Sequence, residues 1–294
     1  MSLFEQAIAR LRNQSANPPQ AKSQQGLRKR VVPDAAQVLE ELPEPAKKIT
    51  LDFNLLRERG YLPEESASRQ FSDHYRRIKR PLIDKAVTES GAKRESRLIM
   101  VTSALPGDGK TFTSINLALS IALERDLSVL LVDCDVSKRH VTDIMGLNDD
   151  QGLVDALLDE SIEAESLIVG TNQRGLSILP AGSQAQGTAE LLSSNRMREI
   201  VAGLCARSPR RIVLLDSPPL LITNEGRVLA KIAGQVALVV RAGRTPRQAV
   251  KDAISLFGAD QAGGIILNDV TTGGSDEYYG HYGYGSYGAG GDAA

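Results

Sequence analysis

Short apolar runs alternate with longer helical stretches from about residue 97 onward. Each run is bounded by turn residues and is too short to fill a helix. The runs cover residues 98–103, 128–133, 176–182, 212–217, 235–241 and 264–269, and helical stretches lie between them at 113–125, 189–207 and 245–258. Continuous apolar strands separated by helices predict an α/β fold, with a mostly parallel, twisted sheet flanked by helices on both faces.

The first 95 residues show a different pattern, in three parts. Apolar residues at helical spacing predict a short amphipathic helix over residues 1–12, which needs a surface on its own domain or on another protein. Residues 13–48 are rich in Pro, Gln, Ala and Ser and predict a flexible linker. Apolar residues return over 49–95, where we expect a helical extension that packs on the main domain at 96–270.

The last segment, residues 271–294, concentrates glycine and tyrosine. It contains eight glycines and no Lys or Arg, so it cannot bury a core and is predicted to be disordered. Aromatic residues make up only 4% of the chain, yet five of its seven tyrosines lie here. They are Tyr278, Tyr279, Tyr282, Tyr284 and Tyr287.

Composition excludes several classes of protein. The 35 basic and 36 acidic side chains among 294 residues nearly balance, which argues against a nucleic-acid partner. No apolar stretch approaches the ~18 residues that a membrane span needs, and the first residues have no apolar signal core. Two cysteines, Cys134 and Cys205, cannot form a disulfide framework, so we expect a reducing cytoplasm.

A phosphate-binding loop follows the first strand of this domain directly. Residues 104–111 read ALPGDGKT and lead into a helix, which is a P-loop with Ala in place of its first Gly. Glycines let backbone N–H groups surround a phosphate, and the helix N-terminus adds its dipole. The predicted nucleotide-binding residues here are Pro106, Gly107, Asp108, Gly109, Lys110, Thr111 and Phe112.

Acidic residues end two further strands on the same side of the predicted sheet. Asp133 and Asp135 close the second strand, and Asp216 closes the fourth. Mg²⁺ prefers carboxylate oxygens together with phosphate partners, so the three residues predict a divalent-cation site. The alternative for any one of them is a helix-capping aspartate.

These motifs together resemble the bacterial tyrosine autokinases (BY-kinases) of capsule and exopolysaccharide production, in the deviant-Walker group of P-loop NTPases. The resemblance runs from about residue 70 to the end. It rests on SALPGDGKT (103–111), VLLVDCD (129–135), IVLLDSPP (212–219) and the tyrosine cluster, with further similarity at 190–194, 239–243 and 266–268. The first twelve residues and RQFSDHYRRIKRPL (69–82) are similar to the subgroup associated with exosortase loci.

Two features separate the chain from septum-site and partitioning ATPases, which share its P-loop. Those ATPases carry a signature lysine at the position of Leu105, and they do not end in tyrosines. The alternative function is nevertheless a dimeric, membrane-associated ATPase switch of that type, with an inert tail. One departure from the autokinase pattern is Ser137, which stands where an arginine is usual, with Lys138 and Arg139 after it.

The resemblance implies an ATP-dependent protein-tyrosine kinase that uses Mg²⁺. Lys110 would neutralise the γ-phosphate, while Thr111 and Asp135 hold Mg²⁺ and Asp216 does so directly or through water. Asp133 would orient or deprotonate the incoming tyrosine hydroxyl. Asn268 resembles the adenine contact, and Arg241 would line the same pocket.

The resemblance also implies partners. The tail tyrosines would be the phosphate acceptors, and a ring of subunits would form through Asp73, Arg76 and Lys79, whose spacing matches an interface motif of the family. A membrane polysaccharide co-polymerase, or chain-length regulator, would activate the kinase and recruit it from the cytoplasm to the inner face of the cell membrane. A cognate tyrosine phosphatase would reverse the modification.

Overall fold

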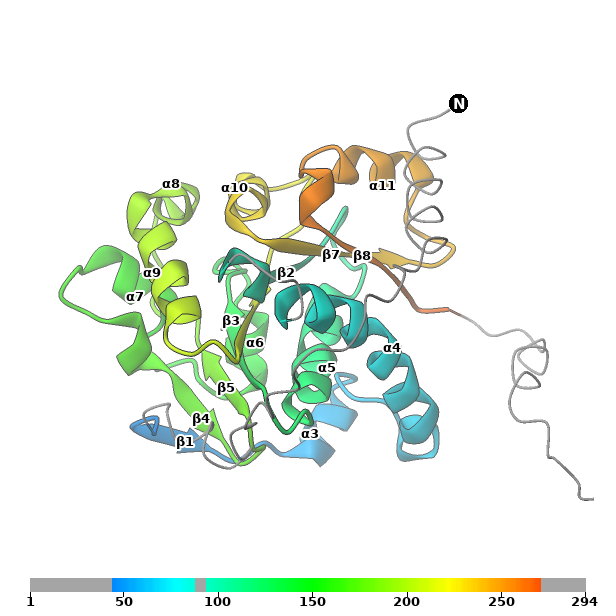
Figure 1. Ribbon diagram of the computed structural model, residues 1–294, viewed down its shortest axis with the longest axis horizontal. Coiled ribbons are helices and arrows are strands. Elements are labelled where there is room, and N and C mark those ends of the chain that lie inside the picture. Colours follow the sequence, from blue (N-terminus) through cyan, green and yellow to red (C-terminus); the bar gives the residue numbers. More distant parts are fainter. Residues whose placement is uncertain (1–43, 88–93, 271–294) are drawn as a thin grey trace, which may run out of the picture. The chain divides into compact units, whose positions relative to one another are not determined.

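The computed structural model describes residues 44–87 and 94–270. Its centre is one eight-stranded sheet (Figure 1) with strand order β1-β4-β5-β3-β6-β2-β7-β8. All neighbouring strands are parallel except β4 and β5, which confirms the predicted mostly parallel α/β fold. The strands are β1 (Lys47–Ile49), β2 (Leu98–Ser103), β3 (Ser128–Asp133), β4 (Val169–Thr171), β5 (Leu176–Leu179), β6 (Arg211–Asp216), β7 (Gln235–Arg241) and β8 (Ala262–Asn268).

Helices cover both faces of this sheet, and alternate residues of each central strand point into one of two apolar cores. Leu98 and Met100 of β2 face one core, and Ile99 and Val101 face the other. The first core is closed by α7 (Leu153–Leu158), α8 (Thr188–Ser193), α9 (Asn195–Ala206), α10 (Asn224–Ile232) and α11 (Arg247–Ile254). The second is closed by α3 (Phe53–Glu58), α4 (Ser68–Val87), α5 (Lys110–Ala122) and α6 (His140–Ile144).

The central strands are buried along their whole length, which explains why their sequences are continuous apolar runs. Every residue of β2, β3 and β6 is buried. A parallel sheet covered on both faces has no polar side, so the pattern of alternating polar residues is missing. The carboxyl ends of these three strands meet at one edge of the sheet, where the candidate site lies.

The predicted linker extends too far, because β1 begins at Lys47 rather than after residue 48. This three-residue strand pairs with β4, and Asn172 fastens the chain just beyond it by accepting a hydrogen bond from Leu51 N–H at 2.9 Å. Both β1 and β4 contain only three residues, which is too short for a readable apolar pattern. Residues 1–12, most of the linker and the tyrosine tail lie outside the described residues.

The helical extension is present as α3 and α4, and α4 packs across α5 (Figure 1). Tyr75, Leu82 and Ala86 are the apolar residues that α4 buries. The 189–207 stretch forms two helices, because Ser194 adopts an extended conformation and caps α9 by accepting from Met197 N–H. No helix in the described part of the chain combines the length and apolar character needed to cross a bilayer.

Candidate active site

Two glycines with positive φ shape the loop between β2 and α5. Gly107 has φ +84° and Gly109 has φ +93°, and Gly109 is the N-cap of α5. Glycine adopts this region without steric cost. Space also requires glycine at 109, because a Cβ there would lie 2.0 Å from Nδ2 of Asn268. The loop therefore presents backbone N–H groups at the start of a thirteen-residue helix, which is the arrangement that binds phosphate.

Asp108 connects this loop to the end of β7. Its carboxylate accepts from Leu105 N–H at 3.3 Å and from the Thr245 hydroxyl at 2.7 Å. Thr245 in turn accepts from Arg241 N–H at 2.9 Å, and Asn268 donates to the Asp108 carbonyl at 3.0 Å. These bonds place the predicted base-pocket residues Arg241 and Asn268 directly beside the loop.

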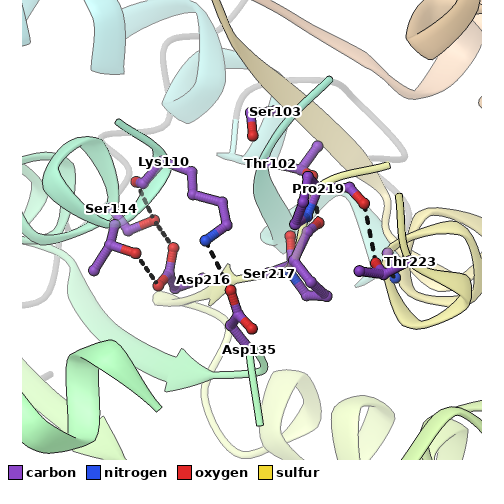
Figure 2. A network of polar contacts seen from close by, with 12 residues as sticks. Thr102, Ser103, Lys110, Ser114, Asp135, Asp216, Ser217, Pro219 and Thr223 are labelled. Carbon is purple, nitrogen blue, oxygen red and sulfur yellow. Dashed lines mark hydrogen bonds and ion pairs between the residues drawn. The ribbon is translucent and has the colours of Figure 1, made fainter. Parts of the chain in front are cut away.

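Lys110 and Asp135 form a buried ion pair across the loop. Lys110 Nζ lies 2.7 Å from Asp135 Oδ2 (Figure 2), and both side chains are almost fully buried. Burial alone would lower the pKa of Lys110, but the charges of Asp216 and Asp135 outweigh it and raise the pKa. Lys110 is therefore an ammonium group, ready to bind an anion that enters the loop.

Asp216 is hydrogen-bonded through both carboxylate oxygens. Oδ2 accepts from the Thr111 hydroxyl and Oδ1 from the Ser114 hydroxyl, each at 2.9 Å. Burial raises the pKa of Asp216, while Lys110 and the two hydroxyls act in the opposite direction. The segment after β6 is fixed to β2, since Thr102 donates to the Pro218 carbonyl and Ser217 donates to the Val101 carbonyl.

Asp133 is bonded through only one of its oxygens. Its Oδ2 accepts from both the N–H and the hydroxyl of Thr142, each at 2.8 Å, whereas Oδ1 is buried and has no hydrogen-bond partner among residues 44–87 and 94–270. Burial raises the pKa of Asp133 to about 7, with a further contribution from Asp216, and the two bonds from Thr142 lower it. A carboxyl group that titrates near neutral pH can exchange a proton during a reaction.

A groove of about 900 Å³ opens beside the loop. Its lining includes Gly107, Phe112, Arg241 and Asn268 on the loop side and Phe71 on α4. The rings of Phe71 and Phe112 meet edge to face, with centroids 5.6 Å apart. The groove also includes Asp269 and Val270, so the described part of the chain ends next to the site.

The predicted interface residues on α4 fall into two groups. Asp73 and Arg76 are exposed and pair with each other at 3.0 Å. Lys79 is only 4% exposed and binds within its own chain, to the Ser120 carbonyl at 2.6 Å and to Glu124 at 2.8 Å. Lys79 therefore lies partly on the inner face of α4 and is bonded within its own chain, and its contact with a neighbouring subunit stays a prediction.

The two basic residues after Ser137, Lys138 and Arg139, lie in different surroundings. Ser137 and Lys138 are exposed, whereas Arg139 adopts φ +52° and donates to the Asn148 carbonyl at 2.9 Å. Arg139 is thus engaged in the turn after α6.

Two residues of the site were missed by sequence reasoning. Ser114 lies one helical turn after Lys110, so its position facing Asp216 could have been found from the period of α5. No local sequence pattern marks Thr142, because its contact with Asp133 forms only when the chain folds.

Comparisons with known proteins identify the family of this chain. A family model described as an AAA domain matches residues 96–241. The chain is 32% identical to the tyrosine-protein kinase YwqD of Bacillus subtilis over 193 residues, covering 65% of this chain and 79% of YwqD. It is also 32% identical to the tyrosine-protein kinase wzc of Salmonella typhimurium, covering 65% of this chain but only 26% of that protein.

Solved kinase domains have a similar fold. The kinase domain of VpsO matches with a TM-score of 0.56 and 30% identity, covering 67% of this chain and 96% of that chain. The kinase domain of the Escherichia coli tyrosine kinase ETK matches with a TM-score of 0.56 and 25% identity, covering 71% and 76% of the two chains. With its loop, buried lysine and three strand-end aspartates, this chain belongs to the bacterial tyrosine-protein kinases.

Proposed function

We propose that this protein transfers the γ-phosphoryl group of ATP to tyrosines of its own C-terminal tail. The observation that carries the proposal is the placement of Lys110, Asp135 and Asp216 around the P-loop, beside a groove lined by Val270, the last described residue. Phosphoryl transfer is mainly positioning and charge neutralisation, and these groups supply both.

The oxygen atoms at the site fit a Mg²⁺ ion that enters with ATP. Thr111 Oγ1, Asp135 and Asp216 would hold the ion, which would neutralise charge on the phosphates. No three His, Cys, Asp or Glu side chains in the described residues are arranged to hold a metal alone. Mg²⁺ usually takes one or two carboxylates and completes its shell with phosphate and water, so a smaller protein set is sufficient.

Nucleotide binding requires Lys110 to exchange its partner at the loop. Lys110 must leave Asp135 before its ammonium can reach a phosphate oxygen, and this movement frees a carboxylate oxygen of Asp135. Thr111 can keep donating to Asp216, because the lone pairs of its hydroxyl oxygen remain available to Mg²⁺. Until a nucleotide enters, the ion pair between Lys110 and Asp135 keeps both charges bonded within the site.

Asp133 is the group that we assign to the acceptor. A carboxylate in water is a weak base toward a phenol, whose pKa is about 10. Burial makes the Asp133 carboxylate a stronger base, because it raises the pKa of Asp133 to about 7. Its role would be to orient the tyrosine hydroxyl and take its proton as the oxygen–phosphorus bond forms.

The tail can reach a neighbouring subunit. A glycine-rich segment of some 20 residues spans about 25 Å, at roughly 5–6 Å times the square root of its length. Asp73 and Arg76 remain the exposed residues through which a ring of subunits could pack. Each phosphotyrosine adds about −1.5 to −2 charge to an already acidic tail, and we propose that this repulsion loosens the ring.

Light scattering tests this switch. The mass of the wild type is compared before and after incubation with Mg²⁺ and ATP, beside a variant with Phe at all five tail tyrosines. We expect the phosphorylated wild type to have a lower mass than the Phe variant, and equal masses would contradict the switch.

A membrane partner and a tyrosine phosphatase complete the proposed role in exopolysaccharide export. The chain spans 26% of the length of the wzc kinase. In this proposal, a membrane co-polymerase activates the kinase and recruits it to the inner face of the membrane. Deleting residues 1–43 would remove the amphipathic segment and keep β1 intact. Loss of recruitment to the membrane fraction would assign that segment to docking, and retention would leave docking to the kinase domain.

Incubation with Mg²⁺ and ATP, followed by mass spectrometry of the tail peptide, tests the proposed kinase activity. We expect phosphotyrosine at residues among the five in the tail, and none in Lys110→Met. Steady ATP hydrolysis with an unmodified tail would overturn the proposal and favour the ATPase switch.

A further inference from the structure

Thr142 makes an unusual pair of contacts with Asp133. Both its backbone N–H and its hydroxyl lie 2.8 Å from the same oxygen, Oδ2 of Asp133. Thr142 and Asp133 are both fully buried. Because water has no access to this contact, nothing can replace the threonine hydroxyl without rearrangement.

The direction of the hydroxyl bond is fixed by a third group. The Ala181 N–H donates to the Thr142 hydroxyl oxygen at 2.9 Å. A threonine hydroxyl carries one proton, and a backbone N–H can only donate, so the hydroxyl proton is free to point at Asp133. Oδ2 of Asp133 therefore receives two hydrogen bonds, and Oδ1 receives none from the part of the chain that the structure describes.

Ala181 is itself held firmly, so this chain of hydrogen bonds begins at a fixed point. It follows β5, and the carbonyls of Pro180 and Ala181 accept from Leu153 N–H at 2.8 Å and Val154 N–H at 2.9 Å on α7. The bonds run from the end of β5, through Thr142 on α6, to the end of β3. They fix the plane of the Asp133 carboxyl group between two neighbouring strands.

From this geometry we propose that Thr142 is a positioning residue, which reserves Oδ1 of Asp133 for the hydroxyl of the acceptor tyrosine. The inference rests on the proposed tyrosine kinase activity. The phenolic proton passes to Oδ1, and the phenolic oxygen bonds to the γ-phosphorus. The bond from that phosphorus to the β–γ bridging oxygen breaks, ADP leaves with its electron pair, and Asp133 then releases the proton to solvent.

Oδ1 is covered in the nucleotide-free structure, so a side chain at the site must move before a phenol reaches it. Lys110 is one side chain that must move, because it cannot bind both Asp135 and a phosphate in the same position. Nucleotide binding would thus open the site while Thr142 keeps Asp133 in place.

Substitutions of Thr142 that differ only in the hydroxyl test the proposal. Thr142→Val keeps the shape and the backbone N–H but removes the hydroxyl, and Thr142→Ser keeps the hydroxyl. With the full chain, Mg²⁺ and ATP, we expect Thr142→Val to lower kcat for tail phosphorylation ten- to a hundredfold, with the KM for ATP within twofold of wild type. Thr142→Ser should restore kcat to within about threefold.

Thr171→Val provides the matched control. Within the described residues, its hydroxyl on β4 bonds only to backbone groups of Gln173 and Leu176. Loss of this network should lower the melting temperature without changing kcat. In an Asp133→Asn background, Thr142→Val should have no further effect on kcat, because it acts through Asp133.

Three results would overturn the inference alone: wild-type kcat in Thr142→Val, equal losses in the Val and Ser variants, or full additivity with Asp133→Asn. If Thr142→Val does not fold, Thr142→Ala and Thr142→Ser carry the same comparison. A wild-type protein that leaves its tail unmodified would instead overturn the proposed function, and this inference with it.

Discussion

The two halves of the candidate site differ in how completely their carboxylates are bonded. In the phosphate half, formed by residues 104–114 and Asp216, both oxygens of Asp216 accept hydroxyl groups. In the acceptor half, formed by Asp133, Thr142 and Ala181, one carboxylate oxygen accepts two hydrogen bonds and the other accepts none. Both aspartates are fully buried, so solvent does not explain the difference.

This difference indicates that the phosphate half holds a cation and that the acceptor half receives a proton. Asp216, which would hold a cation, benefits from being fixed before the ligand arrives, because it then needs no reorganisation during the reaction. A group that receives a proton needs one free oxygen. An unpartnered buried oxygen costs stability, on the order of 1–3 kcal/mol, and such costs are common at functional sites.

The largest expected effect is in the phosphate half. Asp216→Asn places an NH₂ group where either Thr111 or Ser114 now donates, and it removes the charge that would face Mg²⁺. We expect about a thousandfold loss of tail phosphorylation, roughly 4 kcal/mol in the barrier, with loss of Mg²⁺-dependent binding of an ATP analogue. Ser114→Ala keeps the charge and should cost about tenfold. Transfer within tenfold of wild type in Asp216→Asn would remove the distinction between the halves.

Asp133→Asn should have the next largest effect, and a different profile. The amide oxygen can still accept both bonds from Thr142, but the group cannot take a proton. We expect about a hundredfold lower kcat, which is typical for loss of a general base, with nucleotide affinity within twofold of wild type. Fluorescence titration with an ATP analogue measures the affinity. An equal loss of affinity would show that Asp133 belongs to the phosphate half.

The pH dependence of stability follows from the same residue. Burial raises the pKa of Asp133 from 3.8 to about 7, so between these values the folded state binds more protons than the unfolded state. The stabilisation from protonated Asp133 is complete below pH 3.8 and is lost as the pH rises through about 7. Asn stays neutral throughout. The free energy of unfolding of Asp133→Asn relative to wild type should therefore rise from pH 5 to pH 8, by up to a few kcal/mol. Melting temperatures measured across this pH range would show the rise.

This measurement uses protein free of nucleotide and Mg²⁺. Asp252→Asn, an exposed change at the Gln248–Asp252 contact, serves as control. A difference between Asp133→Asn and wild type that is constant with pH would contradict the raised pKa.

The phosphate half could be predicted from sequence far better than the acceptor half. Its loop, its lysine and its following helix are contiguous, and Asp216 ends an apolar run that marks a buried strand. The link from Thr142 to Asp133 spans nine residues, and the bond to Thr142 from Ala181 spans 39. Such contacts depend on which strands are neighbours, and apolar periodicity does not specify strand order. The burial of Lys79 could not be predicted for a related reason, since charge alone does not reveal which face of α4 the residue occupies.

The smallest expected effect comes from the outer part of the acceptor half, where Asp155 fastens the segment that carries Ala181. Burial alone would raise the pKa of Asp155, but hydrogen bonds from the Ser183 hydroxyl and from the N–H groups of Gly152 and Ser183 lower it. Its stabilising contribution is therefore present above the ordinary pKa of 3.8 and is lost as pH falls through the lowered pKa.

Asp155→Asn should lower the free energy of unfolding by about 1 kcal/mol at pH 7, because one oxygen acceptor is lost, and by less near pH 3. Urea titrations at the two pH values measure this difference. Tail phosphorylation should fall only two- to threefold, since Ala181 keeps its backbone bonds to α7 and Thr142 keeps its contact with Asp133. If Asp155→Asn lowered tail phosphorylation as much as Asp133→Asn does, the acceptor half would move as one unit. The position of Oδ1 of Asp133 would then depend on the whole segment rather than on Thr142.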